Sequence, residues 1–210
     1  DIEVLLNKRV IRIDATTKII TFADDEIMNY DSLLLATGGK PRQLDVEGAD
    51  LENIFTLRSF VDTDKILKAA ENASCAVVIG SSFIGMEAAA GLAQKGLQVT
   101  VVSPSVPFEK ILGQEIGKLF QQVHEEQGVK FLLDTKAHKF EGEGKVKAVI
   151  LENGDRLTTD LVVVGVGVQP ATEFLEGVEL HEKDRSVVVD EYLCAADGLY
   201  AAGDIARYPD

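Results

Sequence analysis

The sequence predicts an α/β protein whose core is a parallel β-sheet. Three observations support this fold class. Between about residues 61 and 164, short apolar runs alternate with helical patterns. These runs are apolar on both faces, which is typical of strands in a parallel sheet that is covered on both sides. A glycine-rich turn joins the first of these strands to its helix, as at the start of a βαβ unit.

Before this alternation, the chain predicts a hairpin and one further strand. Residues 10–14 and 18–22 alternate apolar and polar side chains around a short polar turn, so they predict two paired strands with one buried face. The apolar run 33–36 stops at a Thr-Gly-Gly sequence, which indicates a strand followed by a tight turn. Residues 40–53 contain few apolar side chains and predict a connecting segment at a domain boundary.

Helices and strands then follow each other along the rest of the chain. Asp62 or Thr63 can cap a first helix that runs to Glu71. The next predicted elements are a strand at 75–79, a helix at 84–94, a strand at 99–102, a helix at 114–127, a strand at 130–133, a strand at 146–151 that is followed by a turn at 153–154, and a strand at 161–164. The tail from Val187 onward is again typical of strands.

Composition and charge exclude several classes of function. With 46% hydrophobic and 27% charged residues, the chain has the composition of an ordinary globular protein. Its formal charge of -14 argues against nucleic acid as a partner, because phosphate binding needs a basic surface. Cys75 and Cys194 are too far apart in sequence to indicate a metal site or a redox disulphide. They favour a reducing compartment, so we expect a cytoplasmic protein, with a mitochondrial location as the alternative.

No apolar run has the length of a membrane span. The strongest local signal is instead the turn at residues 80–85, which follows one apolar strand and opens a helix. In a dinucleotide-binding turn, three glycines allow the bend, the approach of the pyrophosphate and the packing of helix on strand. Gly80 and Gly85 occupy the first and third positions, and Ser82 stands at the second. The alternative interpretation is that the two glycines only allow a tightly packed turn and bind no nucleotide.

The residue at the end of the next strand decides which nucleotide the site prefers. An acidic residue is expected there, because it binds the ribose of NAD. Ser103 stands at this position instead, and no arginine lies nearby in sequence to bind the 2′-phosphate of NADP. The choice between NADH and NADPH therefore stays open. We expect a slight preference for NADH, because Glu109 is the nearest charge that can reach a ribose.

Four separated motifs resemble those of a known family. The run LLLATGGKPR at 33–42 resembles a strand and turn that close over FAD, and VVIGSSFIGME at 77–87 resembles an NAD turn. The run VVGVGVQP at 163–170 resembles the exit from an NAD domain, and LYAAGDIA at 199–206 resembles a late FAD motif. Together they are similar to the FAD-dependent pyridine nucleotide oxidoreductases. Within that family they resemble the branch of ferredoxin and rubredoxin reductases, monodehydroascorbate reductase and apoptosis-inducing-factor-like proteins.

The resemblance implies a Rossmann-like NAD(P)-binding domain inserted in a partial FAD-binding domain, as in flavoproteins with two dinucleotide sites. Residues 1–58 and 172–210 would form the partial FAD-binding domain, and residues 59–171 the NAD(P)H-binding domain. The family's first FAD turn and its C-terminal interface domain have no counterpart here. We therefore expect a fragment that is inactive alone, and a homodimer formed through the C-terminal domain of the full-length protein.

The resemblance also implies roles for individual residues. For NAD(P)H, the implied binding residues are Gly80, Ser81, Ser82, Ile84, Gly85, Ser103 and Gly167. For FAD, they are Thr37, Gly38, Arg42, Arg58, Gly203 and Asp204. Phe83, near the flavin and nicotinamide, and Glu87, one helical turn further on, are the candidate catalytic residues, and no metal site is predicted. The alternatives are a core position for Phe83, a solvated acid favoured by the helix dipole for Glu87, and surface charges for the two arginines.

The implied function is hydride transfer from NAD(P)H to FAD, followed by electron transfer to an acceptor. Because the chain has no closely spaced cysteine pair, the expected acceptors are a ferredoxin, a rubredoxin, a Rieske protein, or a small quinone or radical. One alternative is a redox-sensing or signalling flavoprotein of the apoptosis-inducing-factor type. Another is a disulphide reductase whose cysteines lie in an N-terminal part that this sequence does not contain.

Overall fold

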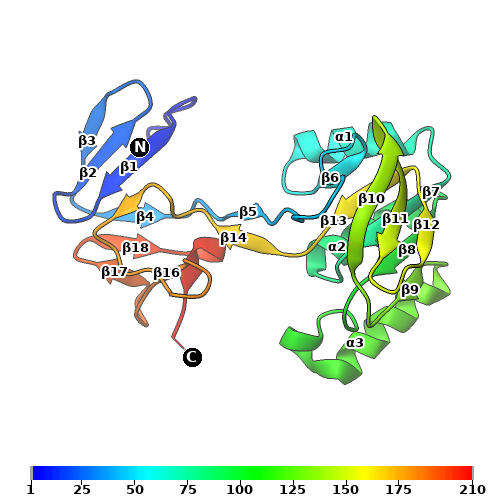
Figure 1. The fold of residues 1–210 in the computed structure, drawn as a ribbon. Helices are drawn as coiled ribbons and strands as arrows, with labels where there is room; N and C mark the ends of the chain where they lie inside the picture. The colour runs from blue at the N-terminus through cyan, green and yellow to red at the C-terminus, as the bar shows by residue number, and fades with distance from the viewer. Residues whose placement is uncertain (1, 210) are drawn as a thin grey trace. The chain divides into compact units, whose positions relative to one another are not determined.

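The computed structural model describes residues 2–209, and the chain divides into two compact units. The first unit contains Asp1–Lys40 and Val168–Asp210, and the second contains Pro41–Gly167. Figure 1 shows that the chain runs from one unit to the other twice, along β5 (Gly39–Pro41) and β14 (Val168–Pro170), which pair with each other. The first unit is built around one hydrophobic core, and the second is built around two that share no residue with it.

The first unit contains two small sheets that share one core. The four-stranded sheet has the order β15-β1-β2-β3, and the three-stranded sheet has the order β17-β18-β4. Their strands are β1 (Val10–Asp14), β2 (Ile19–Phe22), β3 (Ile27–Asn29), β4 (Leu33–Leu35), β15 (Leu175–Glu176), β17 (Cys194–Ala196) and β18 (Leu199–Ala201). The hairpin of β1 and β2 confirms the sequence prediction. A short pair, β16 (Val187–Val188) with β19 (Ala206–Arg207), and the 3₁₀ turn η1 (Gly203–Ile205) complete the unit.

The second unit is built on a five-stranded parallel sheet with the order β6-β13-β7-β8-β9. Its strands are β6 (Ile54–Thr56), β7 (Cys75–Ile79), β8 (Gln98–Val102), β9 (Lys130–Leu132) and β13 (Leu161–Val164). The strands β8 and β9 follow β7 in order on one side of it in the sheet, and β13 pairs with β7 on its other side. This reversal creates a topological switch point beside β7, where ligands of open α/β sheets bind.

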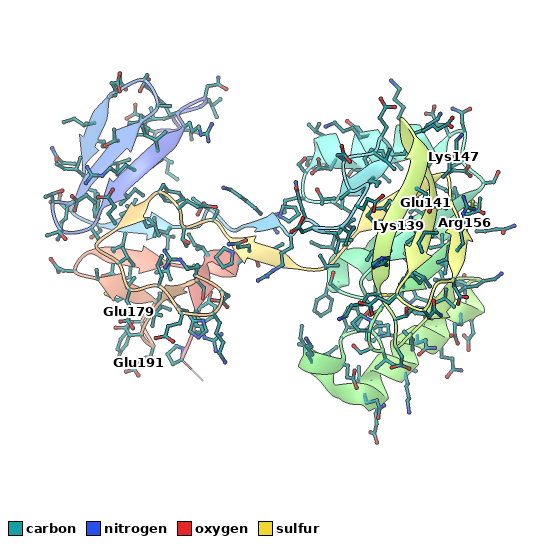
Figure 2. All side chains as sticks on the ribbon, viewed as in Figure 1. Lys139, Glu141, Lys147, Arg156, Glu179 and Glu191 are labelled. Carbon is teal, nitrogen blue, oxygen red and sulfur yellow. The ribbon has the colours of Figure 1, made fainter. Side chains whose placement is uncertain are left out.

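Alternate residues of these strands enter two different cores, because successive side chains point to opposite faces of a sheet. Val78, Val101 and Val163 pack against the helices. Val77 and Val162 face a second, antiparallel sheet made of β10 (Ala137–Glu143), β11 (Lys145–Leu151) and β12 (Arg156–Thr158). The prediction of a parallel sheet covered on both sides is confirmed, with a β-sheet as one of the covers. Figure 2 shows Lys139, Glu141, Lys147 and Arg156 on this second sheet, where Glu141 pairs with Lys139 at 2.9 Å and with Arg156 at 3.4 Å.

Three helices belong to the second unit: α1 (Phe60–Ala70), α2 (Phe83–Gln94) and α3 (Glu109–Glu126). The predicted cap of α1 was wrong: Ser59 is the N-cap, and its side chain and that of Asp62 bond each other's backbone amides in a capping box. In α3, Gly113 has φ 82° and breaks the helix, so the regular part begins close to the predicted residue 114. Among residues 2–209, no helix is long and apolar enough to cross a membrane.

The division into units differs from the predicted boundary near residue 58. Residues 41–58 group with the second unit, because β6 is hydrogen-bonded to β13 in register from Ile54 opposite Val162 to Thr56 opposite Val164. The other predicted boundary, after residue 171, lies close to the observed one after Gly167. The strand β10 was not predicted, since its polar side chains and two irregularities in its pairing obscure the alternation of apolar residues.

Candidate dinucleotide site

The turn after β7 is shaped by glycines that approach one another closely. Gly80 has φ 95°, a conformation that side chains other than glycine rarely adopt. A Cβ at Gly80 would lie 2.5 Å from the carbonyl oxygen of Gly165, and a Cβ at Gly85 would lie 2.4 Å from the carbonyl oxygen of Gly80. A Cβ at Gly165 would lie 2.7 Å from the Cα of Gly85. Side chains at these positions would force β7, α2 and the end of β13 apart.

Ser82, at the second glycine position of the motif, has two structural roles. Its hydroxyl accepts a hydrogen bond from the amide of Gly85 at 3.3 Å, so it is the N-cap of α2. The same hydroxyl donates to the carbonyl oxygen of Gly165 at 2.7 Å. The serine therefore joins the helix start to the end of β13, and its hydroxyl is already occupied by protein partners on both sides.

A pocket of about 280 Å³ opens at the C-terminal ends of β7, β8 and β13. Its walls are residues 80–82 after β7, residues 103–106 and 108–111 after β8, and residues 165–167 after β13. Of the residues predicted for NAD(P)H, the structure places Gly80, Ser81, Ser82, Ser103 and Gly167 on these walls. Gly85 is buried in the glycine contact beside them, and Ile84 follows in the first turn of α2.

Ser103 stands where an acid would bind a ribose, and its side chain is turned into the protein. It is 2% exposed, and its hydroxyl lies 2.7 Å from that of Ser81. The amide of Ser105 also donates to it at 3.4 Å. The end of β8 is thus fastened to the nucleotide turn by a pair of serines, and the carboxylate that usually selects NAD has no equivalent at this position.

Two charged side chains at the start of α3, Glu109 and Lys110, also line the pocket. The sequence predicts a role at this site for Glu109, but not for Lys110, Gly165, Val166 and Phe108, which also line the pocket. For Gly165 the signal was present, because it belongs to the run of residues 163–170 that resembled a domain exit. For Lys110 and Phe108 no motif gave a signal, since their place on the pocket depends on how the segment after β8 folds back.

The two candidate catalytic residues lie on α2. Phe83 is 51% exposed, and its ring stacks on that of Phe108 with a centroid distance of 4.3 Å. Glu87 is exposed one helical turn further along. The structure thus places both near the start of the helix that carries the glycine turn, and their catalytic roles stay predictions.

In the first unit, the residues predicted for FAD come together at the ends of two neighbouring strands. Leu35 of β4 pairs in parallel with Ala201 of β18, and Thr37 and Gly38 follow β4 in the chain. Gly203 and Asp204 follow β18. Because the strands are parallel, both turns begin at the same end of the sheet, where the C-termini of the strands lie. Gly38 and Gly203 have φ 66° and 79°, so both turns use conformations that favour glycine.

Arg42 and Arg58, also predicted for FAD, belong to the second unit. The backbone amide of Arg42 donates to the carbonyl oxygen of Gly167 at 3.0 Å, close to where the chain passes between the units. The amide of Arg58 donates to the carboxylate of Asp62 at 3.1 Å, next to the cap of α1. Their contribution to a flavin site stays a prediction.

The donor set of the pocket fits the phosphates of a dinucleotide. The first amides of a helix have no partner inside it, and the helix dipole favours an anion at this end. Gly80, Gly85 and Gly165 remove the side chains that would keep a ligand away from that helix start. Among residues 2–209, no cluster of three or more His, Cys, Asp or Glu side chains could hold a metal ion.

A parallel sheet whose glycine turn opens onto a pocket at the strand ends defines a dinucleotide-binding protein of the Rossmann class. The family model described as pyridine nucleotide-disulphide oxidoreductase matches residues 1–210, so the chain belongs to this family. The members of the family are FAD- and NAD(P)H-dependent oxidoreductases. The resemblance found in the sequence motifs is thereby confirmed.

Several characterised proteins are similar over almost the whole chain. Apoptosis-inducing factor 3 from Homo sapiens is 36% identical over 212 residues, which cover 99% of this chain and 35% of that protein. Rhodocoxin reductase from Rhodococcus erythropolis is 37% identical over 207 residues, which cover 96% of this chain and 48% of that protein. The ferredoxin reductase for the CYP199A2 system from Rhodopseudomonas palustris superposes with a TM-score of 0.89 at 32% identity, over 97% of this chain and 51% of that structure. The chain thus spans about half, or less, of the length of these proteins.

Proposed function

We propose that this chain is the nucleotide-binding part of an FAD-dependent NAD(P)H oxidoreductase. The chain would bind the nucleotides, and the whole protein would have the oxidoreductase activity. The observation that carries the proposal is the pocket at the ends of β7, β8 and β13, whose walls are a glycine turn and a helix start. The reductases among the similar proteins support it.

The cofactors supply the redox chemistry, since hydride transfer from nicotinamide to flavin needs no side-chain nucleophile. The protein residues bind and orient. Gly80 and Gly85 let the backbone approach the pyrophosphate, and the amides of Phe83 and Ile84 offer hydrogen bonds to it from the first turn of α2. Ser82 keeps this turn fixed to β13 through Gly165.

For FAD, we propose binding by the turns after β4 and β18 in the first unit. Thr37 and Gly38 form one wall, and Gly203 and Asp204 form the other, with the aspartate accepting a hydrogen bond from a hydroxyl of the flavin chain. Two observations support this proposal. Both turns follow the C-terminal ends of two paired parallel strands, and both contain a glycine with positive φ.

The proposed acceptor is a one-electron carrier protein such as a ferredoxin, a rubredoxin or a Rieske protein, or a small quinone or radical. Rhodocoxin reductase and the ferredoxin reductase among the similar proteins support a carrier protein. A redox-sensing function is the second candidate, favoured by the similarity to apoptosis-inducing factor 3. A disulphide reductase is the third; its reactive cysteines would lie in an N-terminal part that this sequence does not contain, because Cys75 and Cys194 are both free and belong to different units. We propose a cytoplasmic location and, for the whole protein, a homodimer.

The nucleotide preference can be tested through the two charges at the start of α3. We propose a slight preference for NADH, because the carboxylate of Glu109 on the pocket wall repels a 2′-phosphate. Lys110 acts in the opposite direction. Glu109→Gln should therefore raise, and Lys110→Gln should lower, the affinity for NADPH relative to NADH by roughly two- to fivefold, as exposed charge pairs do. Equal ratios in the native chain and both variants would overturn this assignment.

The binding proposal itself is tested by calorimetric titration of the 210-residue chain with NADH and NADPH. We expect weak binding of at least one nucleotide, which a saturating concentration of AMP should reduce by competition. Absence of binding for both nucleotides would refute the assignment of the pocket.

A further inference from the structure

The ring of Phe108 is the centre of an aromatic cluster beside the pocket. It is 7% exposed and lies between two other rings: Phe83 stacks on it at 4.3 Å with an interplanar angle of 20°, and Phe120 meets it edge-on at 4.8 Å and 89°. Phe108 also lines the pocket, whereas the other two rings do not. One side chain therefore contacts α2, α3 and the binding site at the same time.

The backbone of Phe108 connects the same three parts. Its amide donates to the carbonyl oxygen of Ser81 in the nucleotide turn at 3.4 Å. Its own carbonyl oxygen accepts the amides of Ile111 and Leu112, each at 2.8 Å, and so starts α3. Through these bonds the segment after β8 is held against the turn after β7.

The conformation of Phe108 is strained. Its φ of 57° lies in the left-handed region, which costs free energy for any residue with a Cβ. Such a conformation persists only when neighbouring contacts determine it, and residues of this kind concentrate at ligand sites. Here the buried core cluster around Phe108, its backbone bonds and the stacked ring of Phe83 hold it in place, and the edge-on ring of Phe120 adds one further contact.

We propose that Phe108 is a positioning residue that keeps the dinucleotide pocket in its binding-competent shape. This inference rests on the proposed function. Phe108 fixes the Phe83 ring on one face and leaves Phe83 half exposed, so that its other face can stack on a planar ring of the bound nucleotide. Without the Phe108 ring, Phe83 and the start of α3 gain freedom that nucleotide binding must then remove.

The chain contains no tryptophan, which provides a direct spectroscopic test. Phe83→Trp introduces a single tryptophan at the edge of the proposed site, and excitation at the red edge of its absorption band selects it over the four tyrosines. Titration of this variant with NADH should quench the tryptophan emission and transfer energy to the reduced nicotinamide. Adding Phe108→Leu should weaken NADH binding about tenfold, in line with the loss of an aromatic contact and of preorganisation. It should also make the tryptophan more accessible to acrylamide in the free protein.

The matched control is Phe120→Leu in the same Phe83→Trp background. It removes the other ring that contacts Phe108 but leaves the pocket wall intact, so the NADH affinity should change less than twofold. Phe108→Tyr should keep the affinity, because it retains the ring. Far-UV circular dichroism of each variant confirms that the sheet is formed.

The outcomes distinguish the two proposals. If the Phe83→Trp variant and the native chain both fail to bind NADH and NADPH, the proposed function is wrong. If binding occurs and Phe108→Leu leaves affinity and acrylamide accessibility unchanged, the positioning role is wrong. Equal losses from Phe108→Leu and Phe120→Leu would also overturn it, because they would show a general packing effect.

Discussion

At the scale of single residues, the contact between Gly80, Gly85 and Gly165 leaves no room for even one methyl group. The distances that a Cβ would make there, 2.4 to 2.7 Å to backbone atoms, are shorter than any van der Waals contact. Since backbone atoms cannot rotate away as the end of a side chain can, relief requires movement of whole elements. We therefore expect substitutions in the glycine contact to affect protein stability and nucleotide binding together.

Gly85→Ala tests this coupling. We expect it to lower the free energy of unfolding by about 1–3 kcal/mol, the usual cost of overpacking, and to weaken NADH binding at the same time. Gly91→Ala is the control on the same helix, because a Cβ there meets no atom within 4 Å. It should raise stability by about 0.5–1 kcal/mol, as alanine favours a helix. Urea denaturation followed at 222 nm measures both, and similar losses in the two variants would contradict the interpretation.

A second prediction for a single residue concerns how Asp184 contributes to stability at low pH. The hydroxyl of Ser186 donates to Asp184 at 2.6 Å, and this bond, with help from the Ser186 amide and from His181, lowers the pKa of Asp184 to about 2. A carboxyl with a depressed folded-state pKa stabilises the protein above its unfolded pKa, and this contribution is lost as pH falls from about 4 to 2. After allowance for its partial exposure, the contribution is about 1 kcal/mol.

Asp184→Asn should therefore cost about 1 kcal/mol at pH 6 and almost nothing at pH 2. Denaturation at the two pH values measures the difference. Glu182→Gln, an exposed acid in the same loop, is the control and should change stability little at either pH. A cost for Asp184→Asn that does not depend on pH would argue against the charge as its source.

Two residues of the site show where sequence patterns stop being informative. The glycine spacing predicted the turn at Gly80 and Gly85, because backbone geometry there admits few residue types. The same pattern left Ser82 and Ser103 as departures from the motif. Their roles depend on hydrogen bonds to Gly165 and Ser81, which come from distant parts of the sequence. Such partners are known only once the strands are assembled.

At the scale of elements, the buried strands were the easiest to predict. The strands β7, β8 and β13 are apolar on both faces, so their composition identifies them without knowledge of their neighbours. The strand β10 could not be found in this way, since much of it is exposed. The start of α1 was predicted too late, although Ser59 and Asp62 form the S-x-x-D pattern of a capping box.

Ser59→Ala tests the corrected cap. The change removes the hydroxyl that accepts the Asp62 amide, and it should lower the free energy of unfolding by about 1 kcal/mol. The bond from Ser59 is also the main cause that lowers the pKa of Asp62. Thr63→Ala, a change at a residue first considered as the cap, should have a smaller effect. Thermal unfolding of both variants is the measurement, and a larger loss for Thr63→Ala would restore the earlier assignment.

At the scale of the whole molecule, the second unit is one continuous segment, whereas the first is made of two. The two hydrophobic clusters on either side of the five-stranded sheet contain only residues between 41 and 167. The cluster of the first unit contains only residues outside that range. The sequence motifs predicted an inserted domain that begins near residue 59, and the compact units divide after Lys40. That these units are the NAD(P)H- and FAD-binding domains stays a prediction.

We therefore expect residues 41–167 to fold when they are expressed alone. This segment contains the glycine turn and every wall of the pocket, so it should bind NADH with the affinity of the full chain. Circular dichroism, a cooperative thermal transition and an NADH titration check the prediction. An unfolded segment would show that the first unit is needed for stability, and a folded segment without affinity would show that it contributes to the site.

The parallel pairing of β4 with β18 also sets an order of events during protein synthesis. Leu33 leaves the ribosome long before its partner Leu199. At about 5–20 residues per second, translation of the intervening chain takes roughly ten to thirty seconds. The inserted unit can complete its folding within this interval, whereas the apolar side chains of β4 stay exposed until β18 is synthesised. We therefore expect β4, the strand that precedes Thr37 and Gly38, to be a segment through which newly made chains bind chaperones or aggregate.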